Sequence, residues 1–324
     1  MIVQANPHYG HAVPINRVIL RHIKDPGVQF LTLQKGDVDV ARNLGSDQLQ
    51  SIIGSADYHI LSEAQLSSLY VAMNQNVPEL TKQGVQQAIK WAIDYEAIAK
   101  NITPLVWTVD QSFLPRGLPG ALTEQPFKQD LDKAKQLLAQ AGFPNGFSTT
   151  MDYTSSSPYS EVAQAIQQDL GKIGIQVQLL PGEQKQVVTK TRTRTHQLAL
   201  LVWGSDYFDP NSNAQAFCAN PDDSDGSKLK IIAWRSHFVD KALTQDAADA
   251  AKALDGAERI ALYQKMQRQF WERAPFAFVL QQNAVAVLRK DVSGLIVGAD
   301  ARLHALLADP QIVRMPRRRA FPSA

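Results

Sequence analysis

Apolar residues recur along this chain at two spacings, one typical of helices and the other typical of strands. The helical spacing of three or four residues predicts amphipathic helices over residues 83–94, 131–141, 157–173, 238–254 and 257–273. Alternating or continuous apolar runs predict strands over residues 17–23, 66–73, 175–179 and 198–203, and a further strand that begins at residues 276–280. Because helices and strands interleave along the chain, the pattern predicts an α/β fold.

Turn and capping residues separate these elements. We expect Pro26 to begin a short helix that Gly36 ends, and Asp47 to cap a second helix. We expect Ser157 to cap the helix that follows it. Proline and glycine interrupt residues 103–128 repeatedly, which predicts an irregular connection there.

Length and charge narrow the class of protein. The 324 residues exceed one ordinary domain of roughly 100–200 residues, so two domains are expected. Lys and Arg number 33 against 31 Asp and Glu, and this near-neutral balance argues against a nucleic-acid partner. The single cysteine, Cys218, excludes an internal disulfide. The first residues lack the basic and apolar regions of a signal peptide, and no apolar run reaches the roughly 20 residues that span a bilayer.

Signatures of catalysis and of cofactor binding are missing from the chain. It contains no nucleotide-binding glycine loop, no serine-hydrolase elbow and no zinc-protease helix motif, so we expect no cofactor. His8 and His11 lie three residues apart without a third ligand nearby, so we interpret them as a surface pair and expect no metal. The basic runs at residues 190–196 and 314–319 are interpreted as solvated surface, with anion binding as the alternative.

The segment WGSDYFDP, residues 203–210, directly follows the apolar strand predicted at residues 198–203. In open α/β sheets, ligands bind just beyond the carboxyl ends of strands. A carboxylate such as Asp206, flanked by Trp203 and Tyr207, suits a cationic ligand group such as an ammonium. The alternative is that Asp206 only caps a turn or a helix.

Six segments of the chain together resemble the family 5 extracellular solute-binding proteins, which are the dipeptide, oligopeptide and nickel receptors of ABC importers. ANPHYG resembles that family's "aNPdYw", LQKGDVDVA its "l.sGeiDia", and MNQNVPEL with VQQAIKWAID its stretch from "N...pPf" to "vRqAi..AiD". LDKAKQLLAQAGFPNGF, IQQDLGKIGIQVQL and VWGSDYFDPNS resemble its "d.ekAkqLLaeAGypdGf", "iq.dLakiGI.v.l" and "gW..Dy.DP". The segments occur in the family's order and extend over nearly the whole chain.

This resemblance implies a fold and a location. The fold is a bilobal clamshell of the type II periplasmic-binding-protein kind, which closes on a ligand between its lobes. Lobe one is expected in residues 1–96 and 290–324, and lobe two, the ligand-binding lobe, in residues 97–289. Because family members begin well upstream of the ANPHYG segment, we expect lobe one to be incomplete. The implied location is periplasmic, although no signal peptide is visible in the chain as given.

The resemblance also implies a function and a set of site residues. The protein would capture a small solute, a peptide or a related compound, and deliver it to ABC permease membrane subunits without catalysing a reaction. Asp206 matches the aspartate with which oligopeptide receptors pair a peptide's amine. Those receptors carry an arginine for the peptide's carboxylate where this chain has Leu200, so Arg192 or Arg194 is the candidate for that contact. The ligand-binding residues that we predict are Trp203, Gly204, Asp206 and Tyr207.

Two alternatives stay open. The first is a shortened, non-binding remnant of such a receptor. The second is an enzyme that uses Asp206 and Asp209 as a pair of carboxylates, although no partner base or metal ligand is visible near them in the sequence.

Overall fold

The computed structural model describes residues 1–11, 15–295 and 297 of the chain. They form two compact units, one of residues 1–65 with the chain from 283 onward, and one of residues 66–282. Helices and strands interleave in the second unit, which confirms the predicted α/β class. Across the described part of the chain, no helix is both long and apolar enough to cross a membrane. The lobe boundaries expected after residues 96 and 289 remain a prediction.

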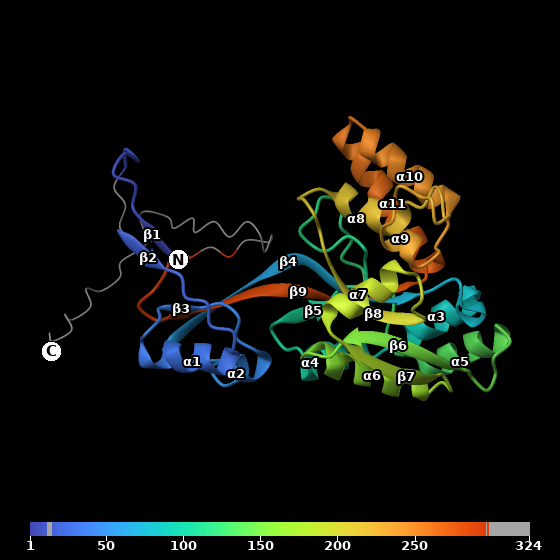
Figure 1. The fold of residues 1–324 in the computed structure, drawn as a ribbon, viewed down its shortest axis with the longest axis horizontal. Coiled ribbons are helices and arrows are strands. Elements are labelled where there is room, and N and C mark those ends of the chain that lie inside the picture. Colours follow the sequence, from blue (N-terminus) through green and yellow to red (C-terminus); the bar gives the residue numbers. More distant parts are fainter. Residues whose placement is uncertain (12–14, 296, 298–324) are drawn as a thin grey trace. The chain divides into compact units, whose positions relative to one another are not determined.

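The bounds of the elements are as follows (Figure 1). The strands are β1 (Ile2–Gln4), β2 (Arg17–Ile19), β3 (Val40–Ala41), β4 (Tyr58–Met73), β5 (Trp107–Val109), β6 (Ser148–Thr154), β7 (Gln176–Gly182), β8 (Leu198–Gly204) and β9 (Phe276–Arg289). The α-helices are α1 (Pro26–Lys35), α2 (Ser46–Gln50), α3 (Gln83–Ala92), α4 (Tyr95–Asn101), α5 (Leu131–Gln140), α6 (Tyr159–Gly171), α7 (Gln184–Arg192), α8 (Pro210–Cys218), α9 (Ile232–Arg235), α10 (Lys241–Lys252) and α11 (Gly256–Arg273). A 3-10 helix spans Pro78–Thr81.

In the first unit, local sequence signals set the ends of α1. The Asp25 side chain accepts a hydrogen bond from the Val28 N–H, and Pro26 is the first helical residue. Gly36 ends the helix in the left-handed conformation, with φ of 75°, as predicted. The expected cap at Asp47 is wrong, because α2 begins at Ser46 and Asp47 lies inside its first turn.

The second unit is built on a mixed sheet in which β8 is an inner strand. Its strands follow the order β9, β4, β8, β6, β7, and β5 pairs with β9. β8 runs antiparallel to β4 and parallel to β6, and β6 runs parallel to β7. Strand β8 therefore joins an antiparallel half of the sheet to a parallel half.

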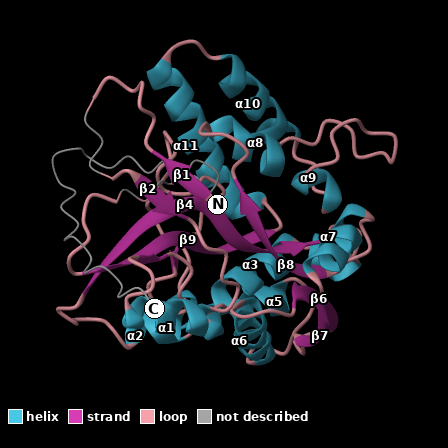
Figure 2. Ribbon diagram, turned by 60° about the vertical axis from the view of Figure 1, so that its left-hand side comes forward, coloured by secondary structure: helices cyan, strands magenta, loops and turns pink. Residues whose placement is uncertain are grey.

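Helices cover both faces of this sheet (Figure 2). On one face, α3, α5 and α6 pack over apolar residues of β4 and β8 such as Leu69, Val71 and Leu200. On the other face, α8 and α11 pack through a cluster of edge-on and stacked aromatic rings. That cluster comprises Tyr70, Trp203, Phe217, Phe270, Phe276 and Phe278. Since both faces are buried, β8 begins with a continuous apolar run, as predicted for residues 198–203.

One face of α3 holds the carboxyl end of α11. Gln83, Gln87 and Lys90 donate hydrogen bonds of 2.8–3.0 Å to backbone carbonyls within residues 271–274. These residues recur at helical spacing, and the carbonyls they meet are among those that a helix end leaves without partners. Lys90 is buried, and burial lowers the pKa of its ammonium to about 7.

Several predicted elements differ from the structure in their bounds. The strand expected at residues 17–23 is only Arg17–Ile19, and the strand expected at residues 66–73 already begins at Tyr58. The helix expected from Ser157 begins at Tyr159. The strand expected to begin at Phe276 does begin there and continues to Arg289, and along it the buried polar Gln281 is satisfied by hydrogen bonds with Arg116. Within the connection expected at residues 103–128, the strand β5 pairs with β9.

His196 is a buried titratable group between α7 and β8. Its side chain is 1% exposed, and within the described residues neither ring nitrogen has a hydrogen-bond partner. The Asn74 side chain donates to the backbone carbonyls of Arg194 and His196 at 3.0 and 2.7 Å, which holds this turn in place. Burial, followed by the charges of Lys190 and His237, lowers the pKa of His196 to about 4.

This environment predicts a loss of stability in acid that depends on His196. Between pH 6.5 and about 4, the unfolded chain binds a proton at this residue that the folded chain resists. The free energy of unfolding therefore falls as the pH falls through this window, by about 3 kcal/mol at most. We expect the His196→Leu variant to lack this component. Urea denaturation of both proteins across the window measures it, and a wild-type-minus-variant difference that does not change with pH would contradict it.

Candidate functional site

The end of β8 is anchored before the chain enters the loop that carries the predicted site. The Ser205 N–H donates to the Leu66 carbonyl at 2.8 Å, which extends the pairing between β4 and β8 by one residue. The Ser205 hydroxyl donates to Asn213 of α8 at 2.6 Å, and Asn213 in turn donates to the Phe113 carbonyl at 2.7 Å. The loop over residues 206–209 therefore starts from a fixed backbone.

Trp203 lies on the face of the sheet that α8 covers. Its ring meets Phe217 edge-on, with 6.0 Å between ring centroids. The Trp203 indole N–H is buried and has no acceptor among the described residues. Ser68 is the register partner of Trp203 on β4, and its hydroxyl is likewise buried without a partner. An indole N–H can only donate, so the Trp203 side chain needs a hydrogen-bond acceptor that the described residues do not supply.

Gly204 ends β8 and is exposed. A Cβ atom built there would meet the Leu66 carbonyl oxygen at 3.9 Å and the Ser67 hydroxyl oxygen at 4.0 Å, both ordinary contacts. The backbone at Gly204 is also outside the left-handed region that favours glycine. The fold therefore does not require glycine here.

Asp206 and Tyr207 are both exposed in the loop after β8. The Ser212 hydroxyl accepts a hydrogen bond of 2.7 Å from the Asp206 backbone N–H, which ties the loop to the first turn of α8. The Tyr207 hydroxyl accepts from the Asn211 side chain at 3.1 Å. The loop thus presents a carboxylate and an aromatic ring beyond the carboxyl end of an inner strand.

Asp209 has a structural role in the same loop. Its side chain accepts from the Asn211 N–H and caps α8, and it forms an ion pair with Arg259 through contacts of 2.6 and 2.9 Å. The hydrogen bond from Arg259 holds the pKa of the Asp209 carboxyl below its usual value. The capping role considered for Asp206 thus belongs to Asp209. A carboxylate held ionised in a cap is unsuited to act as a general acid.

The two arginines predicted to meet a carboxylate differ in their surroundings. Arg192 is exposed in the last turn of α7. Arg194 is 8% exposed and pairs with Asp223, while its guanidinium carbon lies 4.2 Å from the centroid of the Trp234 ring. A ligand carboxylate would have to displace Asp223 to reach the guanidinium of Arg194. The ligand role of Arg194 therefore stays a prediction, and Asp223 competes with the ligand for the same group.

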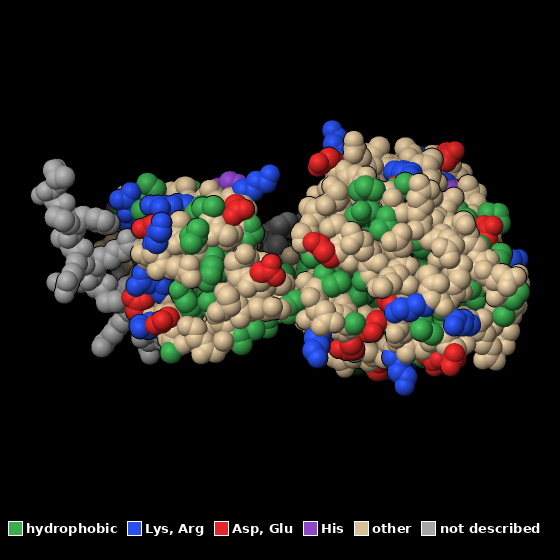
Figure 3. Space-filling view, turned by 90° about the horizontal axis from the view of Figure 1, so that it is seen from below, with side chains coloured by type: hydrophobic (Ala, Val, Ile, Leu, Met, Phe, Trp, Pro, Cys, Tyr) green, Lys and Arg blue, Asp and Glu red, His purple; other side chains and the backbone are tan. Residues whose placement is uncertain are grey.

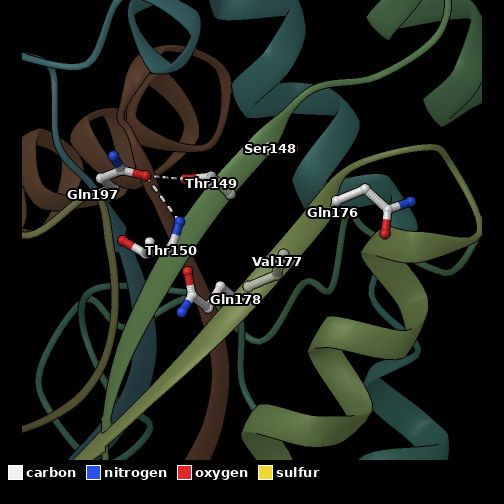
Figure 4. A pocket seen from close by; sticks show the side chains of 7 residues that line it. All are labelled: Ser148, Thr149, Thr150, Gln176, Val177, Gln178 and Gln197. Carbon is white, nitrogen blue, oxygen red and sulfur yellow. Dashed lines mark hydrogen bonds between the residues drawn. The ribbon is translucent and has the colours of Figure 1, made fainter.

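A hollow lies at the opposite end of the parallel strands from this loop (Figure 4). It has a volume of about 430 Å³. The Gln197 side-chain oxygen accepts from the Thr149 hydroxyl and the Thr150 N–H at 2.9 and 2.8 Å. The hollow is lined by Ser148, Thr149, Thr150, Gln176, Val177, Gln178 and Gln197. It adjoins the amino ends of β6 and β7, so it lies at the end that ligands of α/β sheets do not favour.

Cys218 and the surface charges add no reactive centre to this loop. Cys218 ends α8 with 1% exposure, and burial raises the pKa of its thiol well above the usual value, with Asp240 and Asp246 adding to the shift.

On the face drawn in Figure 3, basic and acidic side chains are interspersed. The basic run at residues 314–319 lies outside the described residues.

Comparisons with known proteins place the chain among solute-binding proteins. A family model described as "Bacterial extracellular solute-binding proteins, family 5 Middle" matches residues 1–225. A glutathione-binding protein of Pectobacterium atrosepticum is 23% identical over 88% of this chain. The di/tripeptide-binding protein 2 of Pseudomonas aeruginosa is 25% identical over 90% of it. The chain spans 56% and 54% of the lengths of these two relatives.

Solved structures share the fold. The periplasmic binding protein DppA of Helicobacter pylori, in complex with the peptide STSA, aligns with a TM-score of 0.78 and 24% identity over 95% of this chain and 59% of its own. A dipeptide-binding protein of a Pseudoalteromonas species, in complex with Met-Leu, aligns with a TM-score of 0.72 and 20% identity over 92% of this chain and 59% of its own.

The two contacts of Asp209 predict different outcomes for two substitutions. Asp209→Ala removes both the cap of α8 and the ion pair, and we expect it to lower the free energy of unfolding by about 1–2 kcal/mol. Asp209→Asn keeps an oxygen that can cap the helix, so we expect a loss below about 1 kcal/mol, because the ion pair is partly exposed. Chemical denaturation measures both variants. Equal losses would mean that the ion pair, and not the cap, stabilises the loop.

Proposed function

The chain belongs to the bacterial extracellular solute-binding proteins of family 5, and from this premise we propose that it binds short peptides for an ABC importer. The single observation that carries the proposal is the exposed carboxylate of Asp206 beyond the carboxyl end of β8. A peptide's amino terminus is the cationic group that such a carboxylate would pair with. The family consists of solute-binding proteins and not of enzymes, and we propose that this chain likewise catalyses no reaction.

Several features of the loop support an amine-binding role for Asp206. The preceding backbone is anchored by Ser205, so the carboxylate projects from a fixed start. Gly204 and Tyr207 are exposed on either side of it in the sequence, and Tyr207 offers an aromatic ring. The unpartnered Trp203 N–H is a donor that a carbonyl oxygen of a peptide could satisfy once the indole turns toward it. Relatives named for glutathione and for di- and tripeptides are consistent with this ligand class.

The proposal extends to partners and location. We propose that the ligand is captured between two lobes, the second formed by residues 97–289, and is passed to permease subunits in the membrane. The family's description as extracellular supports action outside the cytoplasm. The alternative of a non-binding remnant predicts the opposite result in a direct binding experiment. The enzyme alternative loses support because Asp209 caps a helix and pairs with Arg259.

The Asp206→Asn variant tests the proposal, since it keeps the shape of the side chain and removes its charge. We expect its affinity for tetra-alanine to fall by about 1.5–3 kcal/mol, the usual contribution of a hydrogen bond to a charged group. Isothermal titration calorimetry measures both proteins. N-acetylated tetra-alanine is the matched control, because it lacks the ammonium and should bind the two proteins equally weakly. An unchanged affinity of Asp206→Asn for the free peptide would exclude the amine contact, and absence of peptide binding by the wild type would favour the remnant.

A further inference from the structure

Strand β7 has one open edge. Within the described residues it pairs with β6 alone and ends the sheet on that side. The N–H of Gln176 donates to the Phe147 carbonyl at 2.8 Å, so the backbone groups of Gln176 face β6. These groups alternate in direction along a strand, so the N–H and carbonyl groups of Val177 and Leu179 point away from β6. The open edge therefore consists of the backbone of these two residues.

The open edge of β7 carries little of the protection that is usual for edge strands. Residues 176–182 contain no charged side chain, whereas natural proteins commonly place charges on such edges. The Gln167 side chain donates to the Val177 carbonyl at 2.7 Å, and Pro181 offers no N–H on the same side. In the part of the chain that the structure describes, the outward groups of Leu179 and the outward N–H of Val177 have no partner. A further strand could bond to them.

Two hollows adjoin β7 and leave room beside it. One is the hollow drawn in Figure 4, of about 430 Å³, and the other, of about 840 Å³, lies between β7 and the exposed side of α6. Gln176 and Val177 contribute to the lining of both. Glu161 is the one charged residue among the residues that line them. Another uncharged strand could therefore approach β7 without displacing a folded element.

The open edge is complementary to a second copy of itself. When two β7 strands run antiparallel about a two-fold axis at Gln178, Val177 of each copy lies opposite Leu179 of the other. Both residues then direct their backbone groups across the axis, so each such pair exchanges both of its N–H···O bonds. The Leu179 N–H of one copy replaces Gln167 at the Val177 carbonyl of the other. Pro181 lies beyond the bonded residues.

Charged side chains near the two ends of α6 fit the same arrangement. This helix returns the chain between the parallel strands β6 and β7, so it runs opposite to β7. The contact of Gln167 with Val177 aligns the two, with exposed Glu161 toward the end of β7 and exposed Lys172 toward its start. Lys172 also contacts Asp169 of its own chain at 2.8 Å. Because the start of one β7 meets the end of the other, Glu161 of each copy approaches Lys172 of its partner.

We propose that the protein self-associates through β7, so that two copies form one continuous sheet about a two-fold axis at Gln178. A second copy is favoured over an unrelated peptide because the hydrogen-bond pattern and the charges beside α6 both match across the axis. The pairing is independent of the proposed ligand site, since β8 lies on the other side of β6 from β7. One sheet edge and one helix make a small interface, so the dimer is reversible and not obligate.

A charge swap at Gln178 tests the proposal, because this residue lies on the axis and would face its own copy. Its side chain is exposed, so Gln178→Lys and Gln178→Glu should leave the packing of β7 intact. Each variant alone places like charges opposite each other, and we expect its dimer dissociation constant to rise about tenfold or more. An equimolar mixture places opposite charges there and should recover the wild-type constant or a lower one. Sedimentation-velocity ultracentrifugation of the full chain over a concentration series measures all of these constants.

The matched controls are Gln245→Lys and Gln245→Glu, at an exposed glutamine on α10. They make the same changes of charge and should leave the dissociation constant at the wild-type value, singly and mixed. A wild type that stays monomeric throughout the concentration series would overturn the inference. A dimer that the Gln178 variants do not weaken, or that their mixture does not restore, would also overturn it, because the contact would then lie on another surface. Equal effects at Gln178 and Gln245 would indicate a response to net charge and would likewise count against pairing through β7.

Discussion

The pairing of β8 with β4 on one side and with β6 on the other is the constraint on which the candidate site depends. Residues 67–73 of β4 pair with β8 along its full length, and β6 adds parallel pairing at its first half. With both edges hydrogen-bonded and the first residues buried on both faces, the strand has one available register. The loop that begins at Ser205 therefore emerges from a fixed point, and α8 is bonded back to it through Asn213.

Most of the fold could be predicted from periodicity, because the helices and strands of the second unit are amphipathic or continuously apolar. The positions that escaped prediction are those where a polar residue is satisfied by a distant partner. Gln281 is a buried polar residue inside β9, and only its hydrogen bonds with Arg116 explain its burial. Lys90 interrupts an apolar stripe, and only the approach of the α11 carbonyls explains its burial. Such partners lie more than 150 residues apart in the chain and leave no local pattern.

The site was predictable only in part, because some of its residues are neighbours in the sequence and others meet only through the fold. Asp206, Trp203 and Tyr207 are contiguous in sequence, so the motif that contains them is visible without a structure. Ser68 could not be found in this way, since it meets Trp203 only through the register between β4 and β8. The distinction between Arg192 and Arg194 also needed coordinates, because Asp223, which occupies Arg194, comes from a loop 29 residues further along the chain.

The burial of Cys218 has a consequence for how motion in this protein can be observed. A thiol that is 1% exposed, and whose pKa is raised by burial, reacts slowly with maleimides because the reactive thiolate is scarce. The chain therefore behaves almost as a cysteine-free background for labelling. A cysteine introduced by substitution at a fully exposed position such as Leu254 would take up a fluorophore or spin label selectively. Pairs of such positions would let distances be followed in solution without first removing the native thiol, which packs at the end of α8.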